Sequence, residues 1–136
     1  MGKKKKLIRF KENKNFERLF EPVALDLLKQ DHEFKGKWLS GYFKRSGRLV
    51  LELGCGGGEY TVGQGKMMPE DNFIGVDIKG ARLYIGVKEA ETLQMPNVCF
   101  VRSQIELIPH IFENEVEFNE KVEPDKKTPQ NGKTEK

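Results

Sequence analysis

A short apolar run that leads directly into a glycine-rich turn is the feature that most constrains how this chain folds. Residues 48–58 read R-L-V-L-E-L-G-C-G-G-G, so one acid, Glu52, lies within the run and four glycines follow it in five positions. The apolar run predicts a buried parallel strand, and the glycines allow a sharp turn and close approach of a ligand to the backbone. A strand, a glycine turn and a helix in this order indicate a nucleotide-type cofactor site. The alternative is a tight connection that binds no ligand, and the number of glycines favours the cofactor.

The spacing of the glycines distinguishes between classes of cofactor. The dinucleotide fingerprint G-x-G-x-x-G requires glycine at position 59, where this chain has Glu59, and this disfavours a nicotinamide-dependent dehydrogenase. The chain has Glu52-x-Gly54-x-Gly56-x-Gly58, which resembles motif I of the class I S-adenosylmethionine-dependent methyltransferases. A carboxylate suits that cofactor because its amino-acid end carries an ammonium and its sulfur is a cation. We therefore predict that these four residues bind S-adenosyl-L-methionine.

Length and composition allow at most one domain with a modest core. The chain has 136 residues, of which 33% are charged, and its apolar residues are concentrated between Leu49 and Phe112. No apolar run is long enough for a membrane span, and the start lacks the pattern of a signal peptide, so we expect a cytoplasmic protein without membrane contact. Cys55 and Cys99 lie far apart in the sequence and predict neither a metal site nor a disulfide framework.

Strand and helix patterns alternate through the middle of the chain. This order predicts an α/β fold, a partial Rossmann-like parallel sheet of about three strands with crossover helices. Gly63 and Gly65 each weaken the first crossover helix by roughly 1 kcal/mol relative to alanine. The predicted strands are 49–53, 72–77 and 98–102, the predicted crossover helices are 59–68 and 81–94, and a short helix over 103–112 begins with the capping-box pattern S-x-x-E.

Polar residues come at the ends of the second and third predicted strands. Asp77 lies about 20 residues after the glycine turn, where a carboxylate can accept hydrogen bonds from ribose hydroxyls. The same acid could cap the next helix at Lys79 or Gly80, and the two roles are compatible. Gln104 follows the third strand. Because parallel strands end at a common edge, we expect Asp77 and Gln104 to lie beside the glycine turn.

The two flanks of this core differ from it in character. Residues 1–46 read as a basic N-terminal arm and a helical lead-in, residues 47–112 as the cofactor-binding α/β core, and residues 113–136 as a disordered polar tail. Lysines and arginines of the arm could hold nucleic-acid phosphates or could simply make it soluble. Residues 15–30 predict a short helix, a break and a second helix that begins at Pro22. We expect Trp38 and Phe43 to pack in the core instead of stacking on bases.

Residues 2–112 resemble the front part of the bacterial tRNA (guanine-N7)-methyltransferases. The motifs that carry the resemblance are M-G-K-K-K-K-L at the start, K-G-K-W at 35–38, L-E-L-G-C-G-G-G-E-Y-T-V-G at 51–63, N-F-I-G-V-D-I-K-G-A-R at 72–82, N-V-x-F-x-R at 97–102 and I-E-L-I at 105–108. The resemblance implies transfer of a methyl group from S-adenosyl-L-methionine to N7 of a guanine in tRNA. By the same resemblance Glu52 and Asp77 contact the donor, and Gln104 occupies the adenine-binding position, where the family has Asp or Asn.

The motif that supplies the family's catalytic acid has no match in this sequence. In the family a later strand leads into F-P-D-P or F-S-D-P-Q, and the aspartate of that motif belongs to the catalytic site. No catalytic residue is therefore assigned, and we expect the cofactor half of such an enzyme, truncated after about three strands, the last of which has an unpaired edge. The alternative function is a catalytically inactive fragment that binds S-adenosylmethionine or RNA.

Overall fold

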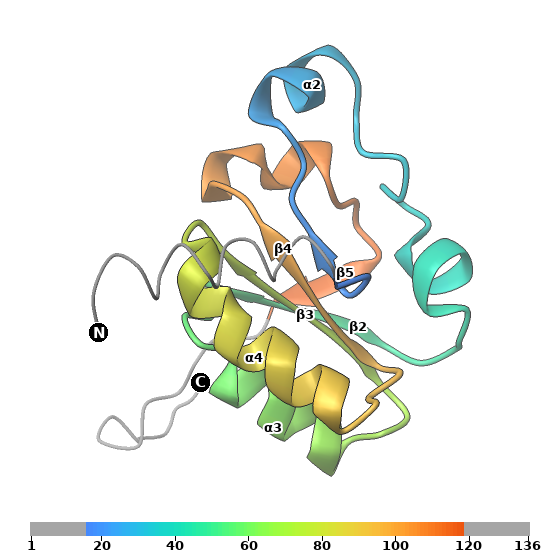
Figure 1. Ribbon diagram of the computed structural model, residues 1–136. Helices are drawn as coiled ribbons and strands as arrows, with labels where there is room; N and C mark the ends of the chain where they lie inside the picture. The colour runs from blue at the N-terminus through green and yellow to red at the C-terminus, as the bar shows by residue number, and fades with distance from the viewer. Residues whose placement is uncertain (1–15, 119–136) are drawn as a thin grey trace, which may run out of the picture.

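Three parallel strands form the centre of the structure, a computed structural model that describes residues 16–118 (Figure 1). They are β2 (Leu49–Leu53), β3 (Asn72–Asp77) and β4 (Val98–Arg102), and β3 lies between the other two. In the register, Leu51 of β2 lies beside Ile74 of β3, which lies beside Cys99 of β4. The predicted α/β fold with a parallel sheet is confirmed.

Two further strands extend this sheet on both sides. β1 (Leu19–Phe20) pairs with β4 and β5 (Val116–Phe118) pairs with β2, both in parallel, so the strand order is β1-β4-β3-β2-β5. The predicted helix over residues 19–20, the predicted lack of structure at residues 116–118 and the count of three strands are therefore wrong. The unpaired edge predicted for β4 is wrong as well, because β1 covers it.

Contacts that are distant in sequence explain why β1 is extended and not helical. The carbonyl of Arg18 accepts a hydrogen bond from the backbone N–H of Phe100 at 2.7 Å. The Arg18 guanidinium donates to the carbonyls of Met95 at 2.6 Å and Val98 at 2.9 Å. These bonds satisfy backbone groups at the edge of β4 that would otherwise lack partners, and together they outweigh the helical spacing of the local sequence.

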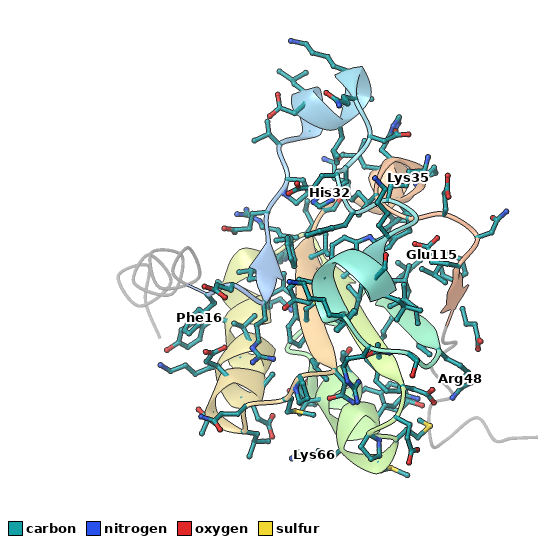
Figure 2. The ribbon with its side chains drawn as sticks, turned by 90° about the vertical axis from the view of Figure 1, so that its right-hand side faces the viewer. Phe16, His32, Lys35, Arg48, Lys66 and Glu115 are labelled. Atoms are coloured by element: carbon teal, nitrogen blue, oxygen red, sulfur yellow. The ribbon has the colours of Figure 1, made fainter. Side chains whose placement is uncertain are left out.

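The two crossover helices cover one face of the sheet. Figure 1 shows α3 (Glu59–Met67) and α4 (Gly80–Thr92) side by side in front of the strands. Both ends of each helix lie within two residues of the predicted bounds, 59–68 and 81–94. Figure 2 shows Phe16 beside α4, where the Nζ of Lys88 lies 5.6 Å from the ring centroid of Phe16. The buried side chains of this layer are Leu19, Val50, Cys55, Val62, Phe73, Leu83, Val87, Ala90, Met95, Val98 and Phe100.

The lead-in segment and the chain after β4 cover the other face. The helix predicted to begin at Pro22 is present as α2 (Ala24–Lys29), but it begins at Ala24 with Val23 as its N-cap residue. The π-helix η1 (Trp38–Phe43) and the 3-10 helix η2 (Ile105–His110) complete this layer. Trp38 and Phe43 are buried there, which confirms their predicted place in the core. The layer's buried side chains are Leu27, Trp38, Phe43, Leu49, Leu51, Ile74, Val76, Cys99, Val101, Ile108, Ile111 and Phe112.

The predicted capping box before η2 does not form. η2 begins at Ile105 with Gln104 as its N-cap residue, and no side chain caps it. The hydroxyl of Ser103 instead bonds the carbonyl of Gln104 at 3.0 Å. Residues 1–15, which hold most of the predicted basic arm, and residues 119–136 of the predicted tail lie outside the described residues. Within residues 16–118, no helix has the length and apolar character that a membrane crossing requires.

Candidate functional site

A hollow of about 460 Å³ lies at the edge of the sheet where the central strands end. Its size falls within the range of about 300–1,000 Å³ that is usual for small-molecule sites. Residues that follow all three central strands contribute to it, as expected for a ligand site in an open α/β sheet. The lining residues are Gly54, Val76, Asp77, Ile78, Ser103, Gln104, Ile105 and Glu106.

The glycine turn between β2 and α3 contributes to this site in two ways. Gly54 has a φ of 69°, in the left-handed region, and a Cβ added there would meet no atom within 4 Å. The end of β2 therefore faces open space in the hollow. Gly58 has a φ of 80°, and a Cβ there would lie 2.8 Å from the ring of Phe100 and 3.2 Å from the Cα of Gly86. Gly54 leaves room beside the hollow, whereas Gly58 lets the turn pack against α4.

Asp77 connects the glycine turn to the start of α4. Its side chain is almost fully buried, and its Oδ2 accepts a hydrogen bond from the N–H of Gly56 at 2.8 Å. Its Oδ1 accepts another from the N–H of Lys79 at 3.0 Å, so the predicted contact with Lys79 is present. Lys79 precedes α4, however, and no side chain of its N-cap residue caps the helix. Because Asp77 also lines the hollow, one carboxylate both holds the turn and faces the space where a ligand would bind.

Glu52 lies deeper than the other predicted site residues. It is 2% exposed, it accepts a hydrogen bond from the hydroxyl of Thr61 in α3, and it is not part of the lining of the hollow. In the sheet it lies beside Gly75 of β3. Of the six predicted cofactor residues, the structure brings Gly54, Asp77 and Gln104 to one hollow. Gly56 is connected to the hollow through its hydrogen bond to Asp77. Glu52 and Gly58 are not part of the lining.

Sequence reasoning missed the apolar walls of the hollow. Ile78 follows Asp77 and is 46% exposed, and Ile105 follows Gln104 and is 56% exposed. The sequence signal that could have identified them is an isoleucine directly after a polar residue that follows or ends a strand, because a large apolar side chain at such a place is available to a ligand. Ser103 and Glu106 also line the hollow without having been predicted.

Neither cysteine has the surroundings of a nucleophile. Cys55 and Cys99 are both free and buried. Burial raises the pKa of the Cys99 thiol well above its ordinary value, so this thiol stays protonated near neutral pH. Cys99 lies within β4 as predicted, whereas Cys55 lies in the glycine turn beyond the end of β2 and not in a strand.

Comparison with known proteins identifies the family. A family model whose printed description is "Putative methyltransferase" matches residues 46–119, more than half of the chain. The chain belongs to this methyltransferase family. The match includes the glycine turn, Asp77 and Gln104, and it confirms the class of protein that motif I predicted.

Two relatives of this chain are named tRNA (guanine-N(7)-)-methyltransferase. The relative from Christiangramia forsetii is 51% identical over 112 residues, which cover 82% of this chain and 50% of the relative. The relative from Bacteroides fragilis is 46% identical over 112 residues, which cover 82% of this chain and 44% of the relative. The chain thus spans about half the length of these curated relatives. Among solved structures, the antibiotic-resistance methyltransferase Kmr superposes with a TM-score of 0.45 and 22% identity, over 50% of this chain and 34% of Kmr.

Proposed function

We propose that this chain binds S-adenosyl-L-methionine in the hollow and takes part in the transfer of its methyl group to N7 of a guanine in tRNA. The observation that carries the proposal is the meeting of Gly54, Asp77 and Gln104 at one hollow in a member of a methyltransferase family. The names of the relatives support the guanine in tRNA as the acceptor. All of the residues that would hold the donor lie within 47–112, the segment predicted as the cofactor-binding core.

The residues around the hollow fit the adenosine part of the donor. The open space beside Gly54 and the volume of about 460 Å³ leave room for it. The carboxylate of Asp77 would accept hydrogen bonds from the ribose hydroxyls. Ile78 and Ile105 offer apolar surface to the base, and the amide of Gln104 can both donate to and accept from the edge of a base.

Buried negative charge suits the other end of the donor. S-adenosyl-L-methionine supplies a methyl group on a positively charged sulfur and also carries an ammonium. Glu52 lies in β2, the strand that leads into the glycine turn, and a charge that is removed from water acts more strongly on neighbouring charges. We assign Glu52 an electrostatic role, in which it favours a cationic ligand above the turn while its hydrogen bond to Thr61 keeps the carboxylate in place.

The proposed reaction makes small demands on acid–base chemistry. N7 of guanine carries a lone pair in the neutral base, so the rate depends mainly on holding donor and acceptor in line. The role of Asp77, Ile78 and Gln104 in this reaction is to fix the position of the donor. No catalytic acid or base is assigned within residues 16–118.

Asp77→Ala is expected to raise the dissociation constant for S-adenosylhomocysteine at least about tenfold, because hydrogen bonds to a charged group are lost. Titration calorimetry measures this change. Asp26→Ala is the matched control, since Asp26 is an exposed acid on α2 that does not line the hollow. Far-ultraviolet circular dichroism should be the same for both variants. An unaltered dissociation constant in the Asp77 variant would count against the assignment of the ribose to this acid.

A transfer assay distinguishes the enzyme from the alternative of an inactive binding fragment. Purified protein is incubated with radiolabelled S-adenosyl-L-methionine and unmodified tRNA, and the label in guanine is measured. Incorporation of label would reject the inactive fragment. Binding of the donor without transfer would show that the chain is a binding module, and in that case only the donor part of the proposal would stand.

A further inference from the structure

An arginine of α4 lies against the glycine turn. Arg82 belongs to the first turn of α4, and its Nη2 lies only 2.7 Å from the position that a Cβ on Gly56 would occupy. Gly56 has a φ of 59°, and its N–H is bonded to Asp77. The guanidinium therefore rests directly on the part of the turn that Asp77 fixes, at the same edge of the sheet as the hollow.

The charge of Arg82 is available at this edge. Arg82 is exposed, and none of the ion pairs found between side chains of residues 16–118 includes it. Arg102, the last residue of β4, differs because its guanidinium has partners. It donates to the carbonyl of Ile78 at 2.9 Å, and its Nη1 lies 3.5 Å from Oε2 of Glu21. Two arginines thus lie near the strand ends, and only Arg102 has its guanidinium held by an acid of the described chain.

The glycine turn consequently has groups of both charges near it. The acid is Glu52, buried within the strand that leads into the turn, and the cation is Arg82 against Gly56. The amino-acid end of the proposed donor is a zwitterion, which carries an ammonium and a carboxylate on the same carbon. A site for such a group needs one charge of each sign a short distance apart, and a planar guanidinium is well shaped for a carboxylate.

We propose that Arg82 binds the carboxylate of the donor's amino-acid end and so positions the donor along the glycine turn. This inference rests on the proposed function, since it assigns a residue to the same ligand. It adds a role for α4, because the helix that follows the ribose-binding strand would then also recognise the opposite end of the ligand. Arg82 would discriminate in favour of ligands that retain the amino-acid group.

The test compares two ligands that differ in that group. S-adenosylhomocysteine has the complete amino-acid end, whereas 5′-methylthioadenosine keeps the adenosine and the sulfur and lacks the carboxylate. Arg82→Gln should raise the dissociation constant of S-adenosylhomocysteine about tenfold, as expected for loss of a charge-assisted hydrogen bond. The same variant should leave the dissociation constant of 5′-methylthioadenosine within twofold of the wild-type value. Arg82→Lys keeps the positive charge but loses the planar pair of N–H donors of the guanidinium. Its dissociation constant for S-adenosylhomocysteine should lie between those of the wild type and Arg82→Gln.

Lys88→Gln serves as the matched control. Lys88 is an exposed cation farther along α4, so this variant makes the same change in net charge at a distance from the glycine turn. It should bind both ligands as the wild type does. An equal loss for both ligands in Arg82→Gln, or no loss for S-adenosylhomocysteine, would overturn the role of Arg82 while leaving the proposed function intact. Failure of the wild type to bind either ligand would overturn the proposed function, and this inference with it.

Discussion

Trp38→Ala is expected to lower the free energy of unfolding by about 3–5 kcal/mol, the usual range for removal of a large aromatic side chain from a core. Trp38 is completely buried, and its indole N–H donates to the carbonyl of Ile111 at 2.9 Å. Its ring stacks on His32, with 5.2 Å between centroids, and on Phe112, with 5.3 Å. The substitution therefore removes both packing and a buried hydrogen bond. Denaturant titration followed by circular dichroism measures the effect.

Tyr60→Ala is the control for loss of an aromatic side chain. Tyr60 is 42% exposed in the first turn of α3, and its removal should change the free energy of unfolding by no more than about 0.5 kcal/mol, as for most surface substitutions. Because small domains are stable by only about 5–15 kcal/mol, the Trp38 variant should lose a large share of its stability. A loss below 1 kcal/mol at Trp38 would show that the layer around η1 is not part of the cooperative core.

The position of Trp38 also links the lead-in segment to the hollow. The carbonyl that Trp38 bonds belongs to the residue directly after η2, and η2 begins at Ile105 beside Gln104, both of which line the hollow. Lys35 and His32 lie in the lead-in segment near η2 in Figure 2. One wall of the candidate site is therefore supported by a segment that is far from it in sequence. The lead-in supports the hollow through packing, without a residue of its own among those that line it.

The central strands could be predicted because short-range patterns determine them. Residues 49–53, 72–77 and 98–102 are apolar runs between turn signals, and each coincides with an observed strand. The placement of Gly54, Asp77 and Gln104 at one hollow could also be predicted, because the ends of parallel strands meet at one edge. That these residues bind a donor stays a prediction.

Features that depend on distant partners could not be predicted in the same way. Leu19 and Phe20 have helical spacing with their neighbours, and only the bonds from Arg18 to Met95 and Val98 show that the segment is extended. Val116–Phe118 lies in a polar stretch and forms a strand because β2 offers it a free edge. The contact of Arg82 with Gly56 depends in the same way on how close α4 lies to the glycine turn.

Gly65 in α3 is another residue whose role cannot be predicted from the local sequence. Helix propensity alone treats Gly63 and Gly65 as equally unfavourable. In the structure, a Cβ on Gly65 would lie 2.5 Å from the Cγ2 of Val98 and 3.0 Å from the Cε of Met95. A Cβ on Gly63 would meet no atom within 4 Å. The first glycine is therefore replaceable, whereas the second is required for α3 to approach β4.

Opposite effects are therefore expected from the same substitution at two positions of one helix. Gly63→Ala should raise the free energy of unfolding by up to about 1 kcal/mol through helix propensity. Gly65→Ala should lower it by about 1–3 kcal/mol, because overpacking against Val98 outweighs the same gain in propensity. Thermal and denaturant unfolding of the two variants, measured beside the wild type, provide the comparison, and each variant is the control for the other. Equal stabilisation by both substitutions would mean that α3 does not pack on β4 as closely as the structure has it, and the glycine turn that leads into α3 would then lack its support.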